Sequence, residues 1–418
     1  MSLLTAALQS SLLIVTIYSA LIMLLALTAR KRGQIVALAL INHAGLFGLA
    51  ALLAIPVISP FHTNYLTLSL AILAELFCVY IFFLSGIGVV NFLKSRASAI
   101  SDRQVVILFV AKALFFAINY FAAGGQYGIF SDDSRIDFLV TSPTLSKTRY
   151  LDGLIDFIIL LGVGIRYTSL KRIRLRDLSI ILAINGFGLL TGSKGSTLLL
   201  TVYVMLFVYA AFPLAFSSKV KLNIICFFSA LVFGYVYILS DILEVTIEAL
   251  INLSLARFIL SADARLMAFD PNISQYVLSQ PHGALLAELF RGPAKMLGIP
   301  VAEFSIGVYQ FQAELGTTNY VGSTGQLIAL LVTYGDDFWL GEFIVVASLA
   351  LFTYKLFSTS LKSRAPGLAW LSAASLYQLS ATLAQGYEAY VQLLPICIVV
   401  IMLFWGSNIM MQKKRIHV

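Results

Sequence analysis

The sequence predicts an all-α fold built from membrane-spanning helices, and three observations lead to this fold class. Apolar residues recur in runs of about twenty, which is the length a helix needs to cross ~30 Å of hydrocarbon. Only 11% of the 418 residues are charged, far below the ~25% of soluble domains. Basic residues gather in alternate loops between the runs. These features exclude a soluble enzyme and a barrel of short alternating strands.

The distribution of charge predicts which loops face the cytoplasm. Most of the 28 basic residues lie in clusters around Arg30, Arg96, Arg172, Lys219, Lys362 and Lys414. Only two acids, Asp102 and Asp177, accompany these clusters. Positive loops remain cytoplasmic in membrane proteins. We therefore expect the N-terminus outside, the C-terminus in the cytoplasm, and no nucleic-acid partner for the net charge of +8.

About eleven spans, with ten to twelve as the range, are expected in one integral domain covering residues 1–418. The spans lie near 9–29, 34–55, 65–90, 104–123, 151–168, 177–191, 196–216, 222–240, 338–357, 366–384 and 388–406. Two outer loops, about 124–150 and 241–325, separate some of them. The apolar stretch from Thr324 to Tyr334 is too short to cross and is expected as a half-helix.

Cationic side chains in the outer loops are candidates for holding a diphosphate. Arg257 and Arg265 are eight residues apart, so on a helix they point to one side. The planar guanidinium grips phosphate oxygens with two hydrogen bonds. Lys194 lies in the hairpin tip Gly192–Ser196, where the next helix begins and its N-terminus favours anions. The alternatives are arginines that reach for lipid headgroups and a lysine in a plain turn.

A general base is expected in the same outer loop. His282 follows Pro281, and an imidazole is the side chain that most often accepts a proton from a hydroxyl in enzymes. Asp263 and Glu314 are rival candidates for the base, and a structural role for His282 is the other alternative. No metal is expected, since the four histidines are scattered and no metal-binding motif occurs.

Charged residues inside the predicted spans need partners in lipid. Glu75 and Lys112 lie in adjacent antiparallel spans and are expected to form a structural ion pair, or else a proton or ion relay. Asp152 and Asp156, one turn apart at the outer mouth of a span, are expected to bind sugar hydroxyls or to cap the helix.

Three segments resemble bacterial O-antigen and oligosaccharide repeat-unit polymerases, a family related to the O-antigen ligases. The first is the small-residue and basic hairpin tip Gly192–Ser196, and the second is the loop from Arg257 to Arg265. The third runs from Asn319 to Thr324 and continues with Tyr334–Gly341. The ligases commonly show a His-Asn pair in the large loop, whereas Gly283 follows His282 here.

The resemblance implies a GT-C-like fold with a large helical periplasmic loop, in the bacterial inner membrane. It implies a glycosyltransferase that joins undecaprenyl-diphosphate-linked repeat units on the periplasmic face, without metal, nucleotide or other cofactor. Donor and acceptor are lipid-linked oligosaccharides, and a chain-length regulator is a candidate partner. The fixed cations would stabilise the departing diphosphate. The implied site comprises, as diphosphate-binding residues, Lys194, Arg257, Arg265 and Arg291, and as sugar-binding residues, Tyr276, Tyr309, Asn319 and Tyr320.

Two other functions remain as alternatives. An O-antigen ligase would transfer the finished polymer to the lipid A-core and would need the same cations. A transporter or flippase for lipid-linked oligosaccharide would want charged residues in the middle of several spans.

Overall fold

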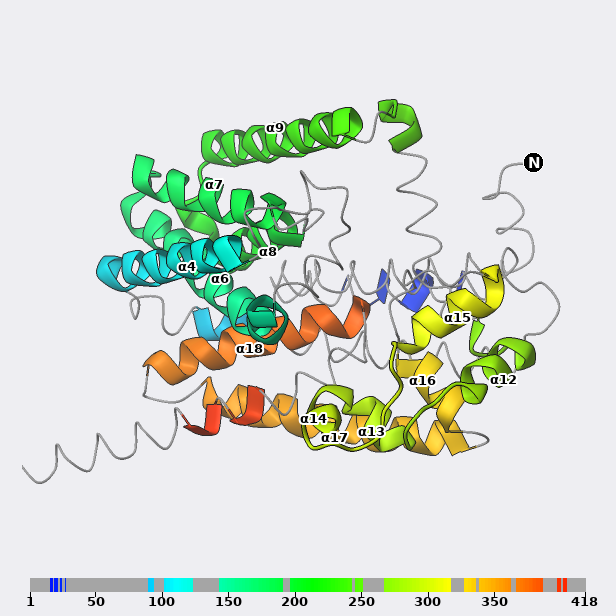
Figure 1. Ribbon diagram of the computed structural model, residues 1–418. Coiled ribbons are helices and arrows are strands. Elements are labelled where there is room, and N and C mark those ends of the chain that lie inside the picture. Colours follow the sequence, from blue (N-terminus) through cyan, green and yellow to red (C-terminus); the bar gives the residue numbers. More distant parts are fainter. Residues whose placement is uncertain are drawn as a thin grey trace, which may run out of the picture.

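The computed structural model shows an assembly of helices, and no strand occurs in the part of the chain that it describes (Figure 1). The described residues are 101–122, 143–190, 196–242, 245–250, 267–316, 327–335, 338–361 and 366–385, with short pieces at 16–17, 19–21, 23–24, 27, 89–93, 397–399 and 401–403. The all-α prediction is therefore confirmed for these residues.

Helix α6 (Pro143–Leu170) is the centre of the bundle. It packs against α4 (Asp102–Ala122), α7 (Leu175–Leu190), α8 (Ser196–Ala211) and α18 (Pro366–Gln385). From Leu154 to Tyr167 most of its side chains are buried. At Gly164 the helix approaches α8 so closely that a Cβ atom would lie 2.7 Å from a methyl group of Val208.

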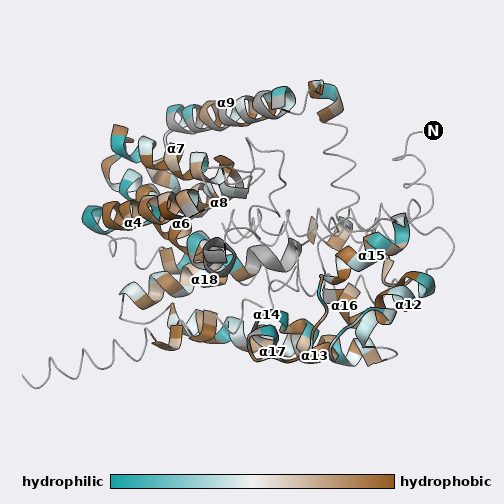
Figure 2. Cartoon of the chain, in the orientation of Figure 1, coloured by the Kyte–Doolittle hydropathy of each residue, from teal (hydrophilic) through white to brown (hydrophobic). Residues whose placement is uncertain are grey.

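Helix α4 has one face buried in the core and an opposite face that is exposed. Its buried side chains recur every seven residues, at Val105, Lys112 and Asn119. The opposite face is apolar and exposed along its length, through Ile107, Val110, Leu114, Ile118 and Phe121. Figure 2 shows this helix as predominantly hydrophobic beyond its first turn. A fully apolar exposed stripe of this kind requires cover by lipid or by another protein.

The other long helices complete the bundle. α9 (Ser218–Ile242) lies along one side of it, after the short 3-10 turn η2 (Pro213–Ala215). α17 (Trp339–Ser360) packs against α18, and α18 in turn packs against α6. α16 (Leu327–Tyr334) is a helix of eight residues that contacts α17. That Thr324 to Tyr334 forms a half-helix that does not cross the bilayer stays a prediction.

A second, smaller core lies at one end of the bundle (Figure 1). Three short helices, α12 (Pro271–Ser279), α13 (Leu285–Leu289) and α15 (Ile306–Leu315), pack around it together with α16. A fourth short helix, α14 (Arg291–Met296), follows α13 and contacts it. We call residues 267–316 the cap. The cap is the described part of the segment 241–325 that was predicted to be a helical outer loop.

Seven predicted spans coincide with long helices, namely α4, α6, α7, α8, α9, α17 and α18. Two described helices, Asp102–Phe121 and Asp152–Leu170, are long and apolar enough to cross a membrane. Helix α6 begins at Pro143, earlier than the predicted 151, because proline is favoured in the first turn of a helix. The predicted span 34–55, and most of 9–29, 65–90 and 388–406, lie outside the described residues.

Candidate functional site

The first turns of the cap are ordered by local sequence signals. Asp270 precedes α12, and its Oδ1 accepts a hydrogen bond of 2.8 Å from the backbone N–H of Asn272. Pro271 occupies the first helical position, where its missing N–H costs nothing. Ile273 and Val277, one turn apart, then point into the small core. The cap is therefore a folded unit and positions its polar residues.

Glu288 links two loop segments of the cap, one at Gly283 and one at Ala302. Its Oε1 accepts backbone hydrogen bonds from Gly283 at 2.7 Å and from Ala302 at 2.6 Å. The side chain is buried, so the carboxylate satisfies two N–H groups that water does not reach. Gly283 has no room for a side chain, since a Cβ atom would lie 2.1 Å from the carbonyl oxygen of Pro300. Glu288 thus has a structural role.

His282 lies on the surface of the cap beside α16. Its Nδ1 is 2.8 Å from the carbonyl oxygen of Gln280, and a carbonyl oxygen only accepts, so Nδ1 donates. In the neutral ring Nε2 then carries the free electron pair that a general base requires. The imidazole packs against the ring of Tyr334, with centroids 5.2 Å apart. His282 therefore meets the first residue of Tyr334–Gly341, a segment that is distant in the sequence.

The other described candidates occupy different positions in the cap. Arg291 is half-buried and donates a hydrogen bond from Nη2 to the carbonyl oxygen of Glu303. Glu314 is exposed in the last turn of α15, and Tyr276 is exposed on α12. Tyr309 is only 4% exposed, and its ring packs against Phe304 in the small core. The predicted stacking of Tyr309 on a sugar does not fit this placement, because the core covers the ring.

Six predicted site residues lie outside the described part of the chain. They are Lys194, Arg257, Asp263, Arg265, Asn319 and Tyr320. Their roles stay predictions.

A buried ion cluster connects α4 to α6. The ammonium of Lys112 lies 2.5 Å from Oδ1 of Asp152 and 2.9 Å from Oδ2 of Asp156. Lys112 is only 3% exposed. Lys112 was expected to pair with Glu75, which lies outside the described residues. The alternative that Asp152 and Asp156 cap a helix is wrong, because α6 begins at Pro143, well before either residue.

This cluster carries one more carboxylate than ammonium. Oδ1 of Asp156 is buried and has no hydrogen-bond partner among the described atoms. A buried carboxylate oxygen of this kind favours a hydroxyl donor or a proton, because an unpaired buried charge is costly. The binding of a sugar hydroxyl by Asp152 and Asp156 stays a prediction.

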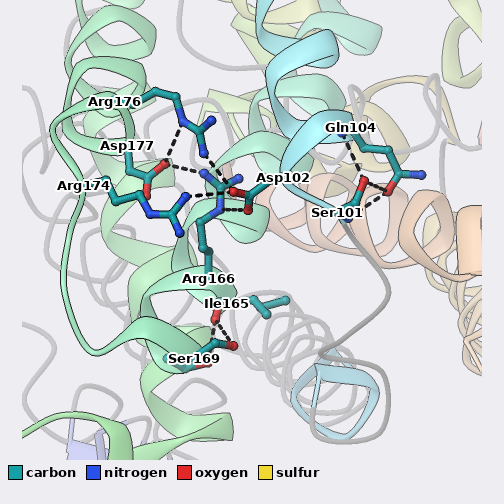
Figure 3. Close-up of polar contacts among 10 residues, drawn as sticks. Ser101, Asp102, Gln104, Ile165, Arg166, Ser169, Arg174, Arg176 and Asp177 are labelled. Atoms are coloured by element: carbon teal, nitrogen blue, oxygen red, sulfur yellow. Dashed lines mark hydrogen bonds and ion pairs between the residues drawn. The ribbon is translucent and has the colours of Figure 1, made fainter.

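A second ion cluster lies where the first residues of α4 meet the end of α6 and the start of α7 (Figure 3). Nε of Arg166 is 2.5 Å from Oδ1 of Asp102, and its Nη1 donates to Oδ1 of Asp177. Oδ2 of Asp102 also accepts from Arg174 at 3.0 Å and from Arg176 at 3.1 Å. Arg166 and Asp177 are buried. We call these five residues the arginine clamp, since they tie three helices together.

Sequence reasoning missed the partners in both ion clusters, although signals for them exist. Asp102 and Asp177 are the two acids in otherwise basic loops, which indicates a specific ion pair. Asp152 and Asp156 are one turn apart and share a helix face. A face with two acids next to a span that carries one lysine predicts the pairing, once the neighbouring helices are known.

Comparison with protein-family models, curated proteins and solved structures gives no match to this chain. The functional argument therefore depends on the residues and their geometry.

Proposed function

We propose that this chain is a glycosyltransferase of the bacterial inner membrane that polymerises undecaprenyl-diphosphate-linked oligosaccharide repeat units. The substrates would be a lipid-linked donor chain and a lipid-linked acceptor unit. The cap would face the periplasm, opposite the basic loops. The reaction would use no cofactor.

The placement of His282 is the observation that carries this proposal. Its ring is exposed, its Nδ1 is committed to the carbonyl oxygen of Gln280, and its Nε2 is available as a base. It also contacts Tyr334, which begins one of the segments that resemble the polymerases. A general base must be accessible to the substrate. Glu288, a carboxylate near His282, is buried and has a structural role.

The proposed step transfers the donor chain to the acceptor. The acceptor hydroxyl attacks the anomeric carbon of the donor, and Nε2 of His282 takes the hydroxyl proton. The bond between the anomeric carbon and the diphosphate oxygen breaks, and undecaprenyl diphosphate leaves with the bonding electrons. Cations stabilise the charge that develops on this leaving group. Arg257, Arg265, Lys194 and Arg291 would supply them.

Membrane embedding is supported by the exposed apolar surface of the bundle. The stripe from Ile107 to Phe121 on α4 has counterparts on α9, at Ile225 and Phe233, and on α17, at Val345. Hydrocarbon would cover these faces, while Lys112, Asp152 and Asp156 turn inward and pair.

The test is to replace Arg257, Arg265 and His282 singly by alanine in cells that lack the native gene product. We expect each variant to lose long surface polysaccharide, which is measured by gel electrophoresis of the extracted material. Loss of a transition-state cation typically lowers the rate ~10²-fold or more. Arg103→Ala is the matched control, because Arg103 is exposed at the opposite end of the bundle and should leave the banding unchanged.

The pattern of the gel separates the possible functions. A lost polymerase leaves lipid A-core capped with single units, whereas a lost ligase leaves bare core and polymer on the carrier lipid. Normal banding in Arg257→Ala and Arg265→Ala, at normal protein levels, would contradict the proposal.

Transport of lipid-linked oligosaccharide is the second candidate, and the cluster of Lys112, Asp152 and Asp156 favours it. Charged groups inside a helical bundle are typical of transporters. In this case, loss of the protein would leave the units in the cytoplasmic leaflet and the core bare. Repeat units that are protected from an added glycosidase in sealed right-side-out vesicles would identify this outcome.

A further inference from the structure

The segment that follows α6 carries cations that the fold does not use. In the arginine clamp, three guanidiniums and two carboxylates already neutralise most of their charge. Lys171 and Arg172, between α6 and α7, are exposed and make no ion pair with a described carboxylate. Lys171 also adopts a positive φ of 52°, so the chain turns sharply at this point. Two positive charges are therefore held on the surface beside the arginine clamp.

Large apolar side chains are exposed among these cations. Ile173 is 49% exposed and Leu175 is 81% exposed. Leu214, in the turn η2, is 98% exposed. The ring of Tyr167, near the end of α6, lies 5.1 Å from the ring of Phe216, so η2 lies beside this end of α6. Three bare aliphatic side chains and two free cations therefore share one end of the bundle.

The position of this surface favours a lipid ligand over a soluble anion. The exposed apolar stripe of α4 begins at Ile107, about one turn after Asp102 of the clamp. Hydrocarbon covering the stripe would bring headgroup phosphates to the level of the clamp. A soluble phosphate would bind the cations without needing exposed leucines. Ammonium and guanidinium groups bind lipid phosphates while neighbouring aliphatic side chains enter the acyl region.

We propose that Lys171, Arg172, Ile173, Leu175 and Leu214 form a docking surface for anionic phospholipid in the membrane leaflet that borders the clamp. We call this surface the basic rim. The inference depends on the membrane embedding proposed above but not on glycosyltransferase activity. Binding of anionic headgroups at the basic rim would fix how deeply α6 and α7 lie in the leaflet.

The test is thermal unfolding of the purified full chain in a neutral detergent, with phosphatidylglycerol or phosphatidylcholine added. A ligand that binds only the native state raises the unfolding midpoint. We expect phosphatidylglycerol to raise the midpoint more than phosphatidylcholine does. In Lys171→Gln/Arg172→Gln this extra shift should vanish, since each cation near the headgroups contributes on the order of fivefold in affinity.

Two matched variants and one soluble anion make the test specific. Lys295→Gln removes an exposed lysine in the cap and should keep the extra shift. Leu175→Ser/Leu214→Ser keeps the cations and should weaken the effect of the lipid. Inorganic phosphate at the same phosphate concentration should produce no shift. An equal response to both lipids in the unsubstituted chain, an unchanged response in Lys171→Gln/Arg172→Gln, or an equal shift with inorganic phosphate would overturn the proposal.

Because the readout is unfolding, it does not depend on the enzymatic proposal. A chain that prefers phosphatidylglycerol but shows normal polysaccharide in Arg257→Ala retains the basic rim and loses the polymerase assignment. A chain that shows no preference for phosphatidylglycerol but loses long polysaccharide in Arg257→Ala retains the polymerase assignment and loses the basic rim.

Discussion

Glu288 and His282 lie close together in the sequence, and the structure gives them different roles. The Glu288 carboxylate is buried and accepts two backbone hydrogen bonds. The His282 ring is exposed and has one nitrogen committed to a carbonyl oxygen. Residue type alone makes both plausible as a base. Burial and partners separate them, because a carboxylate with its lone pairs used inside a fold cannot approach a substrate hydroxyl.

Glu288→Ala should destabilise the cap. The variant leaves the N–H groups of Gly283 and Ala302 without an acceptor, and each buried unsatisfied group costs ~1–3 kcal/mol. We expect a lower unfolding midpoint in detergent and faster proteolysis within residues 267–316. Glu303→Ala is the control, because that side chain is exposed. Equal resistance of the two variants to protease would show that the two hydrogen bonds do not stabilise the cap.

At the scale of elements, α4 and α6 pair through charge as well as through apolar packing. The buried face of α4 repeats every seven residues, and Lys112 is the charged member of that face. Two aspartates one turn apart on α6 meet it. Each partner is tolerable in an apolar bundle only because the others are present, since desolvating an unpaired charge costs several kcal/mol.

Lys112→Met should weaken the association of α4 with α6 severely. It leaves two carboxylates facing each other without a cation, and breaking a buried ion pair in this way costs ~3–5 kcal/mol. The yield of folded protein and its unfolding midpoint are the measurements. Lys112→Arg keeps the positive charge and should lower the yield and the unfolding midpoint much less. Lys112→Met/Asp156→Leu removes one buried acid as well and should recover part of the loss, and no recovery would indicate that packing, not charge, dominates.

At the scale of the whole molecule, the two ends of the bundle differ in charge and in structure. One end carries the arginine clamp and the exposed cations beside it. The other end carries the cap with its own small core. The cap helices α12 and α15 lie beside α16, away from α4 and α7 (Figure 1). For the membrane embedding proposed above, we expect one orientation, with the basic end in the cytoplasm.

Cysteine labelling tests that orientation directly. In a chain with Cys78, Cys226 and Cys397 replaced by alanine, a single cysteine is introduced at Gln275 in the cap or at Arg172 beside the clamp. Both positions are exposed. A membrane-impermeant maleimide applied to cells with a permeabilised outer membrane should label only Gln275→Cys. Both variants should react after the inner membrane is opened, and labelling of Arg172→Cys in sealed cells would reverse the topology.

Helix positions were predictable because apolar runs and charged or glycine-rich breaks are local properties of a chain. The expected spans near 104–123, 338–357 and 366–384 therefore fall on α4, α17 and α18. The site was less predictable. His282 was a candidate from its chemistry, but its contact with Tyr334 depends on the cap folding against α16. Tyr309 resembled a surface aromatic residue, yet the same packing buries it.

The amino-acid sequence by itself determined the helical class, the approximate positions of the long helices and the separation of basic from other loops, because these depend on composition and on periodicity along the chain. Only the tertiary structure decided which charges neutralise each other. Lys112 pairs with Asp152 and Asp156, and Arg166 with Asp102 and Asp177. Coulombic pairing depends on distance in space, and helices far apart in sequence become neighbours only when the bundle packs.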